Sequence, residues 1–153
     1  MKIYLHTMTF ADILNLFRQG KATAKSHIRN LIEIAAADGT FSIDEQHLLS
    51  SIAARNNISH NELQKIRNDP ASIPFEVPGD KQEKFYQLFD LVHMMSVDKS
   101  IHSEEMKLCE LFAIKFGYEK RNVGELIETI RQNIQNGSSP EEAMKRIGAY
   151  MAL

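Results

Sequence analysis

The chain of 153 residues contains no tryptophan, four prolines and a single cysteine. Because Cys109 has no second cysteine to pair with, an internal disulfide framework is excluded, and so is a zinc finger. Three of the four prolines lie between residues 69 and 80, where they predict a stiff connector between two halves of the chain. No apolar stretch approaches the roughly 20 residues of a transmembrane helix.

An excess of charge of one sign is also missing. The sequence has 18 Lys and Arg against 20 Asp and Glu, which gives a formal net charge of -2 at pH 7. Such a balance creates no field that would attract nucleic acid or an anionic membrane. The first residues lack the apolar run of a secretory signal, and the lone cysteine suits a reducing compartment. We therefore expect a single-domain cytoplasmic protein without a nucleic-acid partner or a membrane span.

The spacing of apolar residues predicts an all-α fold, because it is helical nearly throughout and never shows the sustained alternation of a strand. Gly20 predicts the end of a first helix, since glycine accepts the left-handed conformation after a last helical turn. Ser-x-x-Glu capping boxes at Ser42 and Ser59 predict two helix starts. Pro140 after Ser139 predicts the start of the last helix. The expected fold is a bundle of about seven or eight helices.

The sequence also repeats itself with a shift of 60 residues. Residues 35–45, AAADGTFSIDE, return at 95–105 as MSVDKSIHSEE, and the flanking apolar positions are kept. A repeat of this length sets the unit of architecture. We therefore predict two tandem helix-turn-helix repeats with a pseudo-two-fold relation, followed by one C-terminal helix, at about 24–68, 80–135 and 139–153.

Each repeat contains an aspartate at the end of one helix and a glutamate seven residues later, in the first turn of the next helix. These acids are Asp38 and Glu45 in the first repeat, and Asp98 and Glu105 in the second. One interpretation is helix capping, because an acid near a helix N-terminus gains about 0.3–1 kcal/mol from the helix dipole. Ser42 would then complete a capping box with Glu45.

Two details favour a cation over capping alone. His102 occupies the place of the capping serine in the second repeat, yet Glu105 is still present. Asp38 and Asp98 are expected at helix C-termini, where the dipole disfavours a carboxylate. A hard divalent cation such as Ca²⁺ or Mg²⁺ takes oxygen ligands from carboxylates and turn carbonyls. The loop lacks the ligand ladder and the length of an EF-hand, so that type of site is excluded.

At these acidic turns the sequence resembles the TerB-like family of tellurite-resistance proteins. The family pattern is a helix with small residues at its end, then Asp-Gly-x-(aliphatic or aromatic)-x-x-x-Glu, then a second helix. Residues 35–45 match this pattern closely, and residues 98–105 look like a degenerate copy in which Lys99 replaces the glycine. The resemblance covers roughly residues 24–135.

This resemblance implies an all-helical bundle in a bacterial cytoplasmic or membrane-peripheral setting, with a link to tellurite, metal or chemical stress. It also implies a cation bound by acidic residues, which here are Asp38, Glu45, Asp98 and Glu105, with Asp44 and Glu104 as helpers. The family fold also precedes the J-domain of membrane-anchored DnaJ-like co-chaperones. That co-chaperone activity is not implied, because the chain has no His-Pro-Asp motif.

Two other functions stay open. The acids could serve only as caps in an interaction module, in which an exposed helix face docks a protein partner. A di-iron centre could instead be built around Asp90 and His93, because di-iron bundles use acid-x-x-His pairs. The pair occurs only once, and the sequence has no phosphate loop or nucleophile elbow. We therefore expect a non-enzymatic protein, and the sequence leaves its oligomeric state open.

Overall fold

The computed structural model describes residues 9–37, 39–98 and 101–151. These residues form seven α-helices and one short 3₁₀ helix, without a strand, so the all-α prediction is confirmed for them. The elements are α1 Phe10–Ala36, α2 Ile43–Arg55, α3 His60–Asn68, η1 Pro70–Ser72, α4 Lys81–Ser96, α5 Ser103–Lys115, α6 Lys120–Gln135 and α7 Pro140–Met151.

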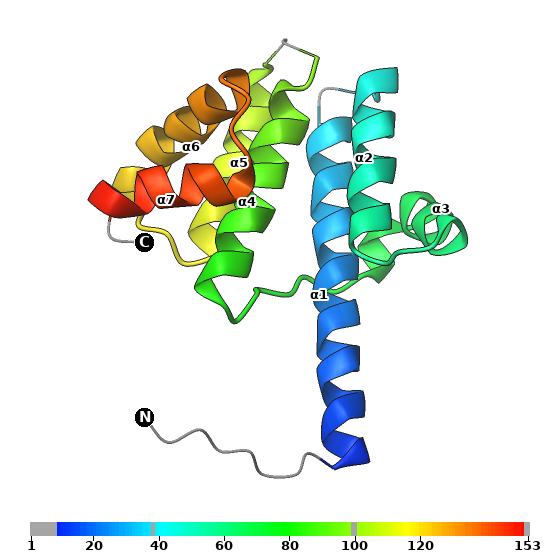
Figure 1. Cartoon of the computed structure of the whole chain (residues 1–153). Coiled ribbons are helices and arrows are strands. Elements are labelled where there is room, and N and C mark those ends of the chain that lie inside the picture. The colour runs from blue at the N-terminus through cyan, green and yellow to red at the C-terminus, as the bar shows by residue number, and fades with distance from the viewer. Residues whose placement is uncertain (1–8, 38, 99–100, 152–153) are drawn as a thin grey trace, which may run out of the picture.

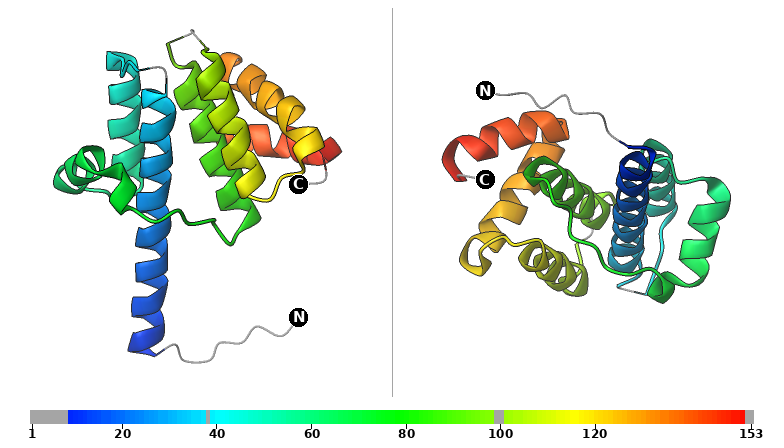
Figure 2. Two further views of the ribbon diagram at one scale, coloured as in Figure 1. Left: turned by 180° about the vertical axis from the view of Figure 1, so that it is seen from behind. Right: turned by 90° about the horizontal axis from the view of Figure 1, so that it is seen from below.

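Helices α1 and α4 form the centre of the fold and pack side by side (Figure 1). Helices α2 and α3 pack on α1, whereas α5, α6 and α7 pack on α4. The core between them is apolar, and Leu31, Phe85, Leu91 and Met94 are completely buried. The N-terminal part of α1 extends beyond the bundle, as the left view of Figure 2 shows.

Two helical hairpins, α1–α2 and α4–α5, have their connecting turns at the same end of the bundle (Figures 1 and 2). The bounds of α2 and α5 differ by 60 residues at both ends, and so do the last residues of α1 and α4. This offset equals the shift of the sequence repeat. The pseudo-two-fold relation between the hairpins stays a prediction.

The predicted helix caps are present. The hydroxyls of Ser42, Ser59 and Ser139 each accept a hydrogen bond from the backbone N–H three residues later, all at 3.1 Å. In each case the glutamate at that third position accepts the N–H of the serine in return. His102 is the N-cap residue of α5, but its side chain makes no capping hydrogen bond. Local sequence patterns therefore located these helix starts correctly.

The prediction that Gly20 ends a helix is wrong, because α1 continues through it to Ala36. Gly39 and Gly117, by contrast, follow helix ends and have positive φ angles of 86° and 103°. A glycine inside a helix costs only about 1 kcal/mol relative to alanine, and the following residues, 21–25, are mostly good helix formers. The packing of the second half of α1 in the core outweighs that cost.

Candidate functional site

The structure places three of the four predicted carboxylates. Glu45 and Glu105 occupy the third position of α2 and α5, and both are buried, with 3% and 2% of their surface exposed. Asp98 lies two residues beyond the end of α4 and is half-buried. Asp38 lies outside the described residues, as does Lys99, the departure from the family pattern.

Glu45 belongs to a complete capping box. Its Oε1 accepts a hydrogen bond from the backbone N–H of Ser42 at 2.8 Å, and the Ser42 hydroxyl accepts from the N–H of Glu45. The predicted capping role is therefore confirmed for Glu45. Capping and cation binding are compatible, because a carboxylate has two oxygens and each has more than one lone pair.

Glu105 is buried to the same degree although the helix start around it is different. Its N-cap residue His102 makes no side-chain cap, and Nε2 of His102 lies 4.0 Å from Oε1 of Glu105. Burying a carboxylate is unfavourable unless hydrogen bonds or an opposite charge compensate for the lost water. Both glutamates are therefore buried, but only Glu45 has a serine partner, Ser42, that accounts for it as part of a capping box.

The two acidic turns lie at one end of the bundle, since α1 and α4 both end there and α2 and α5 both begin there (Figure 1). Within the described part of the chain, no group of three or more His, Cys, Asp or Glu side chains could hold a metal ion. Asp38 is not among these residues. The set Asp38, Glu45, Asp98 and Glu105 therefore stays a predicted cation site.

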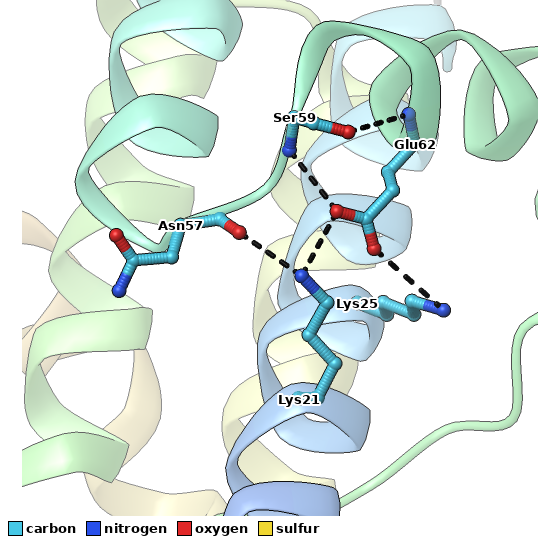
Figure 3. Close-up of polar contacts among 5 residues, drawn as sticks. All are labelled: Lys21, Lys25, Asn57, Ser59 and Glu62. Carbon is cyan, nitrogen blue, oxygen red and sulfur yellow. Dashed lines mark hydrogen bonds and ion pairs between the residues drawn. The ribbon is translucent and has the colours of Figure 1, made fainter.

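Glu62, at the equivalent position of α3, shows how a capping glutamate is compensated by protein cations (Figure 3). Its Oε1 accepts from Nζ of Lys21 at 2.9 Å, and Nζ of Lys25 lies 4.0 Å from its other oxygen. The hydrogen bond from Lys21, followed by that from the Ser59 backbone, lowers the pKa of Glu62 to about 2. Lys21 also donates to the carbonyl of Asn57 at 3.0 Å. This cluster joins α1 to the start of α3.

A second polar cluster lies in the interior, between α1, α2 and α4. Oδ2 of Asp90 lies 2.9 Å from Nε2 of His27 and also accepts from Nη2 of Arg55. His27 and Asp90 are 1% and 4% exposed. The di-iron alternative needs Asp90 and His93 to face further carboxylates. The described partners of Asp90 are instead two basic side chains.

Sequence reasoning missed this interior cluster, although a signal was present. His27 and Asn30 in α1 occupy the positions that Gln87 and Asp90 occupy in α4 after the 60-residue shift. All four are buried polar residues on helix faces that are otherwise apolar. Polar residues at equivalent buried positions of two repeats predict a polar contact between the helices that carry them.

Among the described helices, none combines the length and the apolar character that crossing a membrane requires. No curated protein and no solved structure matches the chain. The model of the family described as Tellurite resistance protein TerB matches residues 5–68. The matched range contains α1, α2, α3 and the first acidic turn, whereas the second acidic turn lies beyond it. Residues 5–68 are therefore similar to the TerB family.

Proposed function

We propose that this TerB-like protein is a non-enzymatic cytoplasmic protein of the bacterial metal or tellurite stress response, which binds a divalent cation at its acidic turns. One observation carries the proposal. Two hairpins place their turns at the same end of the bundle, and each turn is followed by a buried glutamate, Glu45 or Glu105.

The chemistry of the donors fits a hard cation. Carboxylate and backbone carbonyl oxygens are the ligands that Ca²⁺ and Mg²⁺ prefer, and a turn between two helices offers both. Each turn supplies two carboxylates, Asp38 with Glu45 or Asp98 with Glu105. Because so few protein oxygens take part, water would complete the coordination sphere. We therefore expect weak binding, with a Kd of about 0.1–1 mM.

Calorimetric titration of the metal-stripped chain with Ca²⁺, and then with Mg²⁺, Mn²⁺ and Zn²⁺, tests the proposal. We expect saturable Ca²⁺ or Mg²⁺ binding that is lost in the double variant Asp38→Asn/Asp98→Asn. The variant Glu45→Gln should weaken binding at the first turn. Glu142→Gln is its matched control, because Glu142 occupies the same position of a serine capping box in α7.

The outcomes separate cation binding from capping. If Glu45→Gln and Glu142→Gln leave the titration equally unchanged, Glu45 is only a helix cap. If the wild-type chain binds none of the four cations, the proposal is wrong for both turns. Circular dichroism of each variant establishes that the helices have formed before any loss of binding is attributed to a ligand.

A protein-interaction module is the second candidate function, and an exposed apolar face on α1 favours it. Phe10, Ile13 and Leu14 are 75%, 39% and 37% exposed on the part of the helix that extends beyond the bundle. Clustered exposed apolar side chains mark interaction surfaces more often than isolated ones do. Sedimentation of the purified chain tests this function. Self-association that Phe10→Asp removes would assign the face to a homodimer, and would count against an adaptor.

A further inference from the structure

The start of α1 presents an apolar face to solvent. Phe10, Ile13 and Leu14 are spaced three and four residues apart, so they lie on one side of the helix. All three side chains are exposed, and this part of α1 extends beyond the other helices (Figure 2). Because apolar surface is unfavourable in water, a further segment that covers this face would stabilise the protein.

The helix start beside this face is a capping box. The hydroxyl of Thr9 accepts a hydrogen bond from the backbone N–H of Asp12 at 3.1 Å, and the Asp12 carboxylate accepts from the N–H of Thr9 at 3.1 Å. At such helix starts, an apolar residue directly before the cap often packs against the fourth residue of the helix. In α1 these two positions are Met8 and Ile13. Their contact would bring the preceding segment onto the same side of the helix as Ile13.

Three other helices of the chain have apolar residues at the same two positions. In each of them, both residues are buried or pack against the core. These pairs are Ile58 with Leu63 at α3, Ile101 with Met106 at α5, and Tyr118 with Val123 at α6. In α1, Ile13 is exposed and Met8 lies outside the described residues. The comparison favours Met8 as the residue that covers Ile13.

The sequence before α1 suits this face better than a second copy of the chain does. Residues 1–8, MKIYLHTM, are rich in apolar side chains and contain no acid. The segment joins α1 at the cap, so closing so short a loop costs little entropy. The TerB family match begins at residue 5, so it includes half of the segment. A stable interface between two folded chains needs roughly 20–30 residues on each side, far more than the three exposed apolar residues of this face.

We propose that residues 3–8 cover the apolar face of α1 within the same chain. The side chain of Met8 lies against Ile13, and Leu5 lies against Leu14. A protein partner that binds this face therefore has to displace residues 3–8 first. The inference does not depend on the cation site, and it counts against a permanently open docking face on α1.

Nuclear Overhauser effects between methyl groups of the full chain test the proposal. We expect cross-peaks between Met8 and Ile13 and between Leu5 and Leu14. Backbone order parameters of residues 3–8 should exceed about 0.6, the upper limit for flexible backbone. A mixed sample of labelled and unlabelled chains separates contacts within one chain from contacts between two chains. Cross-peaks that arise only between chains would assign the face to a second copy and would overturn the proposal.

The variant Met8→Gln should release the segment, so that both cross-peaks disappear and the order parameters of residues 3–7 fall below about 0.6. Met8→Leu keeps an apolar side chain and should retain the order. Lys2→Gln is the matched control, because it changes a polar residue of the same segment. Order that is unchanged in Met8→Gln would overturn the proposal. So would the absence of a cross-peak between Met8 and Ile13 in the wild-type chain, even if the variant failed to fold.

Discussion

Nε2 of His27 lies 2.9 Å from Oδ2 of Asp90, and this contact joins α1 to α4 in the middle of the bundle. The two residues are 63 positions apart in the sequence, and both are buried. Arg55 of α2 donates to the same oxygen. One carboxylate therefore connects three helices.

The variant Asp90→Ala should destabilise the protein by about 2–3 kcal/mol, because it leaves the buried Nε2 of His27 without its hydrogen-bond partner. Chemical denaturation followed by circular dichroism measures this loss. Asp80→Ala is the control on the same helix. Asp80 is an exposed N-cap whose carboxylate accepts from the N–H of Gln82, and its loss should cost about 1 kcal/mol. Equal losses in the two variants would contradict a special role for the buried contact.

The pair of Lys21 and Glu62 should make stability depend on acid pH. The pKa of Glu62 falls from 4.5 to about 2 in the folded protein, chiefly through the hydrogen bond from Lys21. The stabilisation is therefore present above pH 4.5 and is lost as the pH falls towards 2. Because the side chains of Lys21 and Glu62 are 38% and 30% exposed, solvent screens the pair, and we expect only about 1 kcal/mol.

Denaturation of the wild-type chain and of Glu62→Gln between neutral and acid pH measures this contribution. The difference in unfolding free energy should be constant near neutral pH and should vanish at the acid end. The difference in unfolding free energy between the wild-type chain and Lys21→Met should show most of the same pH dependence, because this variant removes the main cause of the lowered pKa of Glu62. A difference that persists unchanged at the lowest pH would contradict a contribution from the charge of Glu62.

Cys109 should be unreactive in the folded protein. Its side chain is completely buried in α5, and burial raises the pKa of the thiol to about 12. Since the thiolate is the reactive species, a disulfide reagent at about pH 8 should modify Cys109 only after unfolding. The variant Ser103→Cys adds an exposed thiol at the start of the same helix, and should react at once. Rapid modification of the wild-type chain would mean that α5 opens readily.

The variant Gly20→Ala should stabilise the protein by about 0.5–1 kcal/mol, because Gly20 is inside α1 and alanine is the better helix former. An added Cβ would meet no atom within 4 Å. Gly117→Ala is the comparison variant and should lower the stability, because Gly117 has a φ of 103° and alanine would be strained there. Thermal unfolding of both variants measures the effects, and a loss of stability in Gly20→Ala would contradict a continuous helix.

The sequence by itself determined the helical class, the capping boxes and the positions of the acidic turns. Each of these features depends on residues close together in the chain. A serine and a glutamate three positions apart, such as Ser42 and Glu45, contact each other in any helix that starts there. The continuity of α1 could not be predicted in this way, because the small local cost of Gly20 is outweighed by packing that involves distant residues.

Only the tertiary structure decided which distant residues meet. The shared end of the two acidic turns follows from the way α1 and α4 lie side by side, and so does the contact of His27 with Asp90. A repeat establishes that two segments are alike, but their relative orientation depends on how their apolar faces pack. That packing is a property of the whole core, since no single helix can bury its apolar face alone.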